Sequence, residues 1–543
     1  MLLYQLLITI ILAALLLNTI NNLRLLRRPR LPAAIAGSPL VSILVPARNE
    51  ARSIARCVEA LARQEYPHSE ILVLDDQSED ETAAIVARLA RRHPHLRLLH
   101  GQPLPPNWHG KAYACAQLAQ AARGEWLLFV DADTELSPGC VSTALRHAQA
   151  RRADLLTLMP MLVAKSFGEA LLLPIIPLTF VAFLPLGLVT NHPSPLFAGA
   201  LGPFLLFRRA SYQRIGGHAS VRTDIVEDMQ LSRLVKRQGG CVVWMDGTAL
   251  LRVRLYHGFR EAWHGIAKSS FAAINYSLLG LLLGVPICVA LFWGPYGFLA
   301  ADVLRHPSSR LLLWLPLAQI LLLWSAHLLV MRRFRLPPVS MLLQAGTALA
   351  IVLTTLYSAA QTKLGHGVAW KGRTYHFDAL PRREERRIGW AAGLVGARLL
   401  IALLLVLSAW PGGGVRVAEA LLLLGWTLAL LEHTARRGAE SRWVLWADVA
   451  GGAACLGYLG LSGQLSAQVA LPVLLLIGVG LRWFPWPVTA LLASLLPGSI
   501  LLITAEAQAP STLLRGWSLL IALLASRSLA RQVIPWLQRF RSP

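Results

Sequence analysis

Short apolar runs of strand length alternate with amphipathic helical patterns between residues 39 and 268. The expected strands lie at 41–45, 71–74, 96–99, 126–130 and 155–158, and the expected helices between them at 53–64, 81–93 and 111–123. This alternation predicts an open, Rossmann-like α/β sheet with right-handed crossovers. Ligands of such sheets bind beyond the carboxyl ends of the strands, so candidate chemistry is sought there.

Long apolar runs dominate the rest of the chain. Runs of spanning length occur near 1–26, 274–301, 311–331, 341–362, 389–410, 415–432, 443–461, 467–481, 486–504 and 513–529. The expected fold class is an α/β domain embedded in an α-helical multispan membrane protein. Its expected parts are a retained N-terminal anchor at 1–30, the α/β domain at 38–268, membrane helices at 270–380 and a second multispan block of unknown role at 381–543.

Basic residues next to the apolar runs give an orientation. The anchor is followed by Arg24, Arg27, Arg28 and Arg30, so the positive-inside rule places the α/β domain in the cytoplasm of a multi-pass cell-membrane protein. Counting spans back from the basic C-terminus also places 370–388 inside, whereas counting forward through three spans places it outside. Either one of the three middle segments is re-entrant, or 274–301 is a hairpin.

The apolar segment 170–190 is long enough to cross a bilayer, but three prolines interrupt it, Pro174, Pro177 and Pro185. A span here would separate two acidic clusters, 131–133 and 227–228, on opposite sides of the membrane. We therefore expect this segment to lie in the interface or to be buried under the α/β domain.

Composition narrows the class of protein. Hydrophobic residues form 55% and charged residues 15% of the 543, with a mean hydropathy of +0.51, which excludes disordered, collagen-like and coiled-coil chains. The net charge of +23 would fit nucleic acid as a partner of a soluble protein. Here the basic residues flank apolar runs, so we expect lipid headgroups and no nucleic acid as partner. The six cysteines show no metal-ligand spacing.

The strongest chemical signal is Asp131-Ala132-Asp133, directly after an expected strand. Carboxylates at i and i+2 of an extended segment point the same way and can share one divalent cation, which would neutralise a departing diphosphate. The alternative is two solvated acids in a turn. The preceding apolar strand and the acids elsewhere favour the cation site.

Two further loops end expected strands. Asp76, in the run 74–78, is placed to accept a hydrogen bond from a base N–H, although Ser78 and Glu81 also fit a helix capping box. The loop 46–50 can lie against a nucleotide, although its last two residues also suit an ordinary helix start.

Glu227 and Asp228 begin an amphipathic pattern. One of them can be a general base, although acids are also common in a first helical turn because of the helix dipole. Before another expected helix, Lys111 can bind a phosphate and Trp108 can form a wall of the sugar or lipid site. The alternatives are a surface lysine and a packed tryptophan.

Together, residues 39–268 resemble a family 2 inverting glycosyltransferase with the GT-A fold. The matching motifs are Val45 to Glu50, Leu74 to Ser78, Asp131 to Asp133, Gly216-Gly217 and Glu227-Asp228. The motifs Trp108 to Lys111 and Trp370 to Tyr375 resemble the membrane-bound, carotenoid- and hopanoid-associated branch. The resemblance covers at most residues 1–380.

The resemblance implies a role for each matching residue. Asp228 would be the general base with Glu227 beside it, and Asp133 would ligate Mg²⁺ or Mn²⁺ with Asp131 near the metal and ribose. The implied donor site of a UDP-sugar consists of Pro46, Arg48, Glu50, Asp76, Lys111 and Asp131. The implied reaction is a single displacement at the anomeric carbon, with inversion and loss of UDP.

One departure from the family concerns the QxxRW motif of processive members. The comparable stretch here runs from Phe259 to Trp263, in which Trp263 is in register and Arg260 is displaced. We therefore expect transfer of a single sugar, with Trp108 and Trp263 at the acceptor.

The expected function is metal-dependent transfer of one sugar from a UDP-sugar to the hydroxyl of a membrane lipid, such as a carotenoid or hopanoid. One alternative acceptor is a polyprenyl phosphate, whose ionised oxygen needs no general base. Another alternative is a multispan transporter or flippase with a regulatory nucleotide-binding domain. Arg398, inside an apolar run, is either a functional membrane charge or a snorkelling side chain.

Overall fold

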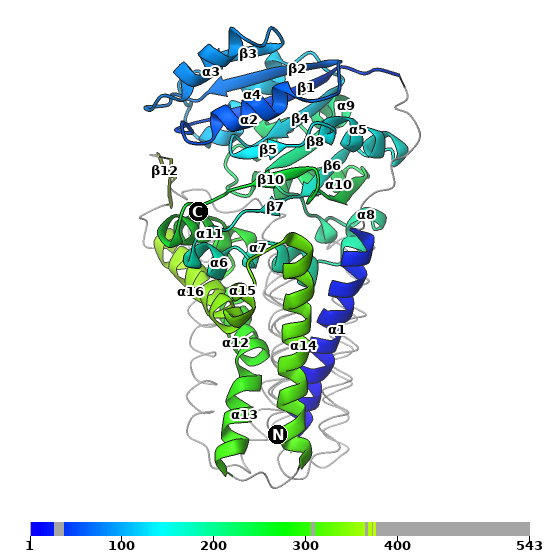
Figure 1. The fold of residues 1–543 in the computed structure, drawn as a ribbon, viewed down its shortest axis with the longest axis vertical. Helices are drawn as coiled ribbons and strands as arrows, with labels where there is room; N and C mark the ends of the chain where they lie inside the picture. Colours follow the sequence, from blue (N-terminus) through cyan, green and yellow to red (C-terminus); the bar gives the residue numbers. More distant parts are fainter. Residues whose placement is uncertain (1, 27–36, 306–309, 364–367, 372, 376–543) are drawn as a thin grey trace, which may run out of the picture. The chain divides into compact units, whose positions relative to one another are not determined.

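The computed structural model describes residues 2–26, 37–305, 310–363, 368–371 and 373–375 (Figure 1). The expected multispan block at 381–543, Arg398 within it and the basic residues at 27–30 lie outside these ranges. The site motifs from Pro46 to Trp263 all lie inside them.

A seven-stranded sheet forms the centre of the α/β domain, in the order β3-β2-β1-β4-β8-β6-β9 (Figure 1). Its strands are β1 (Val41–Ala47), β2 (Ser69–Asp75), β3 (Leu96–His100), β4 (Trp126–Val130), β6 (Leu155–Met159), β8 (Phe204–Arg208) and β9 (Val242–Asp246). The predicted sheet is confirmed, and all five predicted strands form. β8 and β9 were not predicted, and β8 runs antiparallel to both of its neighbours.

Helices cover both faces of this sheet because side chains alternate along each strand. Ile43 and Ile71 face a core shared with α2 (Ile54–Ala62), α3 (Thr82–Ala90) and α5 (Cys140–Ala150). Leu44 and Leu72 face the opposite core, shared with α4 (Gly110–Ala121), α9 (Arg209–Arg214) and α10 (Glu227–Arg237). The strand order reverses between β1 and β4, which is where such sheets bind ligands.

A second, three-stranded sheet begins immediately after the Asp131–Asp133 turn. It consists of β5 (Thr134–Leu136), β10 (Leu251–Val253) and β7 (Met161–Leu162). The turn is thus held between two strands, and the backbone N–H of Thr134 donates to the carbonyl of Asp131 at 3.0 Å.

The apolar segment 170–190 is broken into short pieces. They are α6 (Phe167–Leu172), α7 (Ile175–Leu178), a π-helical turn (Thr179–Phe183) and α8 (Leu186–Asn191). Pro174 and Pro185 stand directly before α7 and α8. Asn22 fixes the segment, because its amide donates to the carbonyls of Val181 and Leu184 at 2.9 and 2.7 Å, and its oxygen accepts from the N–H of Leu186 at 3.0 Å.

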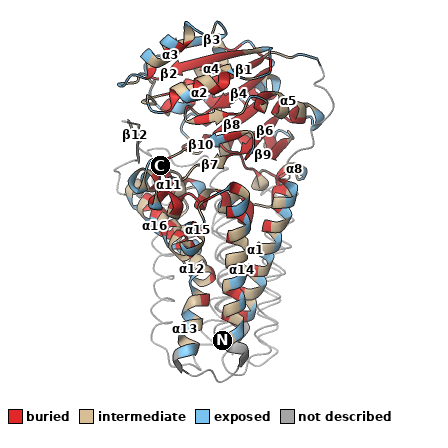
Figure 2. Ribbon diagram, in the orientation of Figure 1, coloured by how far each residue is buried: buried red, intermediate tan, exposed pale blue. Residues whose placement is uncertain are grey.

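Two described helices have apolar stretches long enough to cross a membrane, Tyr4–Leu25 in α1 (Leu2–Leu25) and Leu313–Phe334 in α14 (Arg310–Phe334). A third would be formed by α12 (Leu278–Phe292) and α13 (Gly294–Arg305) if this pair, bent by 47°, is one span. Figure 2 shows that much of the surface of these helices is not buried by protein. Large apolar side chains such as Ile10, Leu17 and Trp314 are more than 60% exposed, as expected of residues that face lipid.

The segment expected to span at 341–362 forms two helices in the structure. Here α15 (Val339–Leu342) precedes α16 (Gln344–Lys363), which contains five Thr and Ser residues and is not among the candidate spans. Its Ala350 lies in a buried cluster with Leu172 of α6 and Ile266 of α11 (Phe259–Ala273). The hydroxyl of Thr347 donates to the carbonyl of Leu171 at 2.8 Å. This helix therefore packs against the α/β domain.

Candidate active site

Lys111 connects the two acidic motifs that the sequence predicted. It lies in the first turn of α4, and its Nζ is 2.7 Å from Oδ1 of Asp131 and 2.9 Å from Oε1 of Glu227. Residues 111, 131 and 227 come from a helix, a strand end and another helix, so only the folded sheet brings them together. The structure thus places the two acidic motifs in one site. This agrees with the expectation that the 170–190 segment does not cross the membrane between them.

Asp228 occupies a fixed position beside this triad. Its Oδ2 accepts a hydrogen bond from the backbone N–H of Gly202 at 2.8 Å, and its Oδ1 accepts from the N–H of Met229 at 2.8 Å. Burial and the neighbouring Glu227 raise the pKa of Asp228 to about 7, against the effect of Lys111. Burial also acts to raise the pKa of Glu227, but Lys111 lowers it overall. Asp228 is therefore the one suited to accept a proton.

Gly202 is a site residue that the sequence analysis missed. A Cβ built on it would lie 3.2 Å from Nζ of Lys111, 3.3 Å from Oδ2 of Asp131 and 3.5 Å from Oδ2 of Asp228. The backbone therefore passes so close to the charged groups that a larger side chain would displace them. The available signal was a set of small residues before an apolar strand, namely Ala198, Gly199, Ala200 and Gly202.

Asp133 has an incomplete set of partners. Its Oδ1 is buried without a hydrogen-bond partner among the residues that the structure describes. Burial, Asp131 and Glu50 together raise the pKa of Asp133. An orphaned carboxylate oxygen beside other acids is what a divalent cation would complete, so the residues fit Mg²⁺ or Mn²⁺.

The protein side chains do not form a closed metal cage. Within the described ranges, no group of three or more His, Cys, Asp or Glu side chains is arranged to hold a metal ion. A cation held by Asp131 and Asp133 would therefore take its remaining ligands from a diphosphate and water, which is usual for Mg²⁺.

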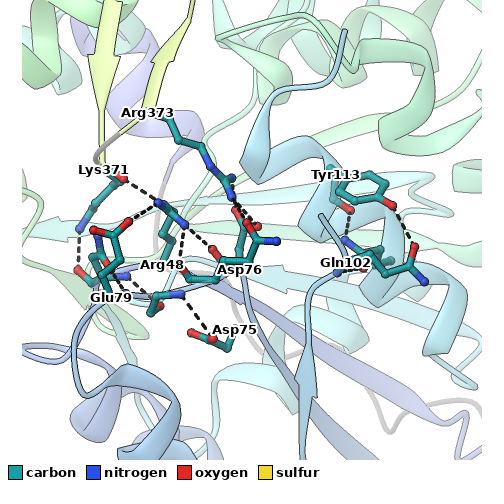
Figure 3. A network of polar contacts seen from close by, with 12 residues as sticks. Arg48, Asp75, Asp76, Glu79, Gln102, Tyr113, Lys371 and Arg373 are labelled. Atoms are coloured by element: carbon teal, nitrogen blue, oxygen red, sulfur yellow. Dashed lines mark hydrogen bonds and ion pairs between the residues drawn. The ribbon is translucent and has the colours of Figure 1, made fainter. Parts of the chain in front are cut away.

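The predicted nucleotide-binding loops meet at the carboxyl ends of β1 and β2. Pro46 is the second-last residue of β1 and is paired with Leu74 of β2. Arg48 donates from Nη1 to the carbonyls of Asp76 and Gln77 at 2.8 and 2.6 Å (Figure 3). Strand alternation places Asp76 on the α4 face, with Lys111, and Asp75 on the other face. Arg48 thus connects the two loops, and Asp76 is the acid on the same side of the sheet as Lys111.

The capping box predicted from Ser78 and Glu81 does not form. Helix α3 begins at Thr82, whose N–H bonds to Oδ1 of Asp80 at 3.0 Å. The Ser78 hydroxyl instead accepts from the N–H of Asn49 at 3.0 Å. Ser78 therefore joins the two nucleotide-side loops, because Asn49 lies in the loop after β1.

Two cations at the nucleotide end come from residues that received no role from the sequence. Lys371 lies 3.1 Å from Oε1 of Glu50, and Arg373 forms a two-point ion pair with Asp76 (Figure 3). Both belong to the Trp370 to Tyr375 motif, which the sequence analysis used only as a mark of resemblance. A third cation, Lys268, is affected electrostatically by Glu227, which opposes the lowering of the Lys268 pKa by burial.

The structure gives the two predicted acceptor residues different surroundings. Trp108 packs edge-on against Tyr113 of α4, with ring centroids 5.1 Å apart. Trp263 lies near Phe259 of its own helix and Tyr357 of α16, at centroid distances of 5.8 and 6.2 Å. The two tryptophans therefore do not form one aromatic wall.

The Gly216-Gly217 motif has a conformational reason. Both residues have positive φ, +78° and +53°. The Tyr212 ring lies against Gly217, and the Tyr212 hydroxyl is 2.8 Å from Nδ1 of the buried His218. After this turn, the carbonyls of Arg222 and Asp224 lie within hydrogen-bond distance of the backbone N–H and the Nδ1 of His109. Helix α10, with its two acids, begins three residues later.

Comparison with known proteins finds a family match over part of the chain. Residues 42–216 match the profile of glycosyl transferase family 2. The 4,4'-diaponeurosporenoate glycosyltransferase of Staphylococcus aureus is 28% identical over 236 residues, which cover 42% of this chain and 60% of that protein. The chain thus spans less than two thirds of the length of this relative.

Two solved structures are also similar. The mannosyltransferase PcManGT from Pyrobaculum calidifontis, in complex with GDP-Man and Mn²⁺, shares 19% identity, covering 67% of this chain and 99% of that one, with a TM-score of 0.41. S. aureus TarS 1–349 in complex with UDP-GlcNAc shares 16% identity, covering 63% and 98%, with a TM-score of 0.30. From the profile match and the curated relative, this chain carries a glycosyl transferase family 2 domain, which confirms the resemblance predicted from its motifs.

Proposed function

We propose that this chain is a multi-pass membrane glycosyltransferase that moves one sugar from a UDP-sugar to the hydroxyl of a membrane lipid, with inversion at the anomeric carbon. The supporting observation is the convergence of Lys111, Asp131, Glu227 and Asp228 around the Gly202 backbone. The carotenoid-type acceptor is taken from the name of the S. aureus relative. The α/β domain and its donor are proposed to be cytoplasmic.

In this mechanism Asp228 accepts the proton of the acceptor hydroxyl. Its two backbone hydrogen bonds fix the carboxylate, and its raised pKa suits proton transfer near neutral pH. Glu227 keeps Lys111 in place without competing for the proton, because Lys111 lowers the pKa of Glu227. Positioning and fixed charge contribute most of the rate enhancement.

Asp131 and Asp133 would hold Mg²⁺ or Mn²⁺, which supplies positive charge to the leaving diphosphate. Lys111, already paired with Asp131, would lie beside that diphosphate. Asp76 would accept a hydrogen bond from the uracil N–H, with Pro46, Arg48 and Glu50 along the same edge. Trp108 and Trp263 remain the proposed acceptor contacts, in separate subsites.

The test is UDP release by the purified full chain in lipid nanodiscs with Mn²⁺ or Mg²⁺, with extracted membrane lipids as acceptor and mass spectrometry of the products. We expect a lipid to gain one hexose mass, and we expect Asp133→Ala and Asp228→Asn to abolish the gain. A polyprenyl phosphate acceptor would give product with Asp228→Asn. Binding of UDP without turnover of any UDP-sugar would instead favour a transporter or flippase with a regulatory domain.

A further inference from the structure

A short hairpin reaches the nucleotide end of the site from far along the chain. It consists of β11 (Val368–Trp370) and β12 (Arg373–Tyr375), which pair antiparallel. It follows α16 and lies 297 positions after Asp76, the residue that it contacts. Figure 3 shows its two cations directed at the loops after β1 and β2. The family profile ends at residue 216, so the hairpin lies well outside the matched domain.

Arg373 engages both oxygens of Asp76. Its Nη1 is 2.5 Å from Oδ2 and its Nη2 is 3.1 Å from Oδ1, while Nη2 also lies 3.2 Å from Oε1 of Gln77. The Asp76 residue is only 3% exposed. A buried carboxylate without a partner is costly, and the planar guanidinium is the group that satisfies both oxygens at once.

The same hairpin holds two other predicted donor residues. Lys371 is paired with Glu50 through its Nζ, and its backbone carbonyl accepts from Nε of Arg48 at 3.0 Å. Arg48, Glu50 and Asp76 are therefore each bonded to the hairpin. The motifs had predicted that all three residues bind the same ligand. An incidental surface contact would rarely involve all three of them.

The site also makes room for Arg373. A Cβ on Gly110 would collide with Nη1 of Arg373 and would lie 2.9 Å from Oδ2 of Asp76. Gly110 is the first residue of α4 and directly precedes Lys111. The guanidinium thus lies between the acid of the nucleotide end and the helix that carries the catalytic lysine.

We propose that Arg373 is a positioning residue of the donor site, which fixes the Asp76 carboxylate for hydrogen bonding to the base of the donor nucleotide. The β11–β12 hairpin is then a part of the donor site. This inference rests on the proposed function, because it requires a nucleotide donor whose base is read by Asp76.

The charges around Asp76 support this role. Burial raises the pKa of Asp76, whereas Arg373 and Arg48 oppose the rise and Asp75 adds to it. Burial raises the pKa of the Cys115 thiol of α4, and Asp76 also contributes to that rise. Removal of Arg373 raises the pKa of Asp76 further. Nucleotide binding by such a variant then weakens as the pH falls, because a protonated carboxyl is a poorer acceptor for a base N–H.

The experiment measures nucleotide affinity by calorimetry on the full chain in nanodiscs, with UDP, GDP, ADP, dTDP and the matching free nucleosides as probes. Asp76→Asn, Arg373→Ala, Arg373→Lys and the Asp76→Asn/Arg373→Ala double variant are compared. We expect Arg373→Ala to weaken the binding of the preferred nucleoside diphosphate and of its free nucleoside by the same factor, about tenfold or more. We expect the double variant to match Asp76→Asn alone and Arg373→Lys to recover part of the affinity.

Arg214→Ala is the matched control, because Arg214 forms an exposed ion pair with Asp154 at 3.1 Å outside the donor site. Unchanged or tighter binding by Arg373→Ala would overturn the inference, as would additive losses in the double variant. A loss limited to diphosphates would place Arg373 on the phosphates and also overturn it. Wild-type protein that binds none of the four nucleotides would overturn both this inference and the proposed function.

Discussion

Asp76 is a buried acid and Asp133 a half-buried one at the same edge of the sheet, and their surroundings differ. Both oxygens of Asp76 are engaged by Arg373, whereas Oδ1 of Asp133 has no partner within the described residues. The first carboxylate is fixed by the protein itself. The second is a group whose partner would come from outside the chain, and the proposed partner is a divalent cation.

The two acids differ in what completes their hydrogen bonding. The Asp76 carboxylate is positioned by protein groups, whereas the Asp133 carboxylate would be completed by a bound ligand. A carboxylate with both oxygens paired to protein tolerates burial and still has lone pairs for a ligand N–H, while one with an unpaired buried oxygen is destabilising until a ligand binds. On the proposed function, the side chains around Asp76 would be in place before the nucleotide binds, and the site at Asp131 and Asp133 would be completed by the cation and diphosphate. The following predictions test that division.

Asp133→Ala is expected to have the largest effect. Loss of a metal ligand should lower UDP release by roughly 10³-fold or more, because a bound cation contributes several kcal/mol at the departing diphosphate. Mn²⁺ binding, followed by electron paramagnetic resonance, should fall in parallel. Glu135→Gln is the control two residues away, since Glu135 is paired with Arg56 and Arg252. Full activity of the Ala variant would remove the metal end from the proposal.

Asp228→Asn is expected to lower the rate of sugar transfer to a hydroxyl by roughly 10² to 10⁴-fold. The amide keeps the size of the side chain but accepts no proton. In the wild type, the rate should fall as the pH drops through about 7, because protonation of Asp228 removes the base. A flat pH profile, together with an active Asn variant, would point to an acceptor that is already ionised.

Gly202→Val should lower transfer by roughly 10 to 100-fold, because the added methyl groups would displace Lys111 and Asp131 from their ion pair. The matched control is Gly139→Ala, where a Cβ meets only Glu65 at an ordinary 3.6 Å. UDP release assays on both variants give the comparison. Equal activities would mean that the close approach of the Gly202 backbone has no role in catalysis.

The smallest expected effect concerns stability. Asn22→Ala removes three hydrogen bonds to the 181–186 segment and should lower the free energy of unfolding by about 1–3 kcal/mol. Asn18→Ala removes only one, to the carbonyl of Ala182, and should cost less. Thermal unfolding in detergent would rank the two variants, and the reverse order would contradict the assigned hydrogen bonds.

Much of this architecture follows from local sequence. Five strands and the helices α2, α3 and α4 are visible as apolar periodicities, whereas α5 was not predicted. The strands β2 and β4 end directly before Asp76 and Asp131, because strand ends are local features. In the seven-stranded sheet, the two unpredicted strands are β8, which follows the broken apolar segment from α6 to α8, and β9, which follows α10.

The contacts that complete the site are non-local, which is why the sequence does not give them. Lys111 reaches Glu227 across 116 positions and Arg373 reaches Asp76 across 297. Gly202 was missed because its contribution is the absence of a side chain. A helix forms where the span at 341–362 was expected, but its packing against α6 and α11 was not predicted, because apolar character alone does not separate a lipid-facing helix from one packed on protein.

The position of the hairpin in the chain also sets an order of assembly during synthesis. The last residue of the expected domain, 268, precedes Arg373 by 105 residues, all of which must leave the ribosome before Asp76 gains its partner. At translation rates of about 5–20 residues per second, this delay is roughly 5 to 20 seconds. During that interval the sheet can fold while Asp76 lacks its ion pair with Arg373. If Arg373 positions Asp76 for the donor base as proposed, a nascent chain would bind donor tightly only after α12, α13, α14 and α16 have been made.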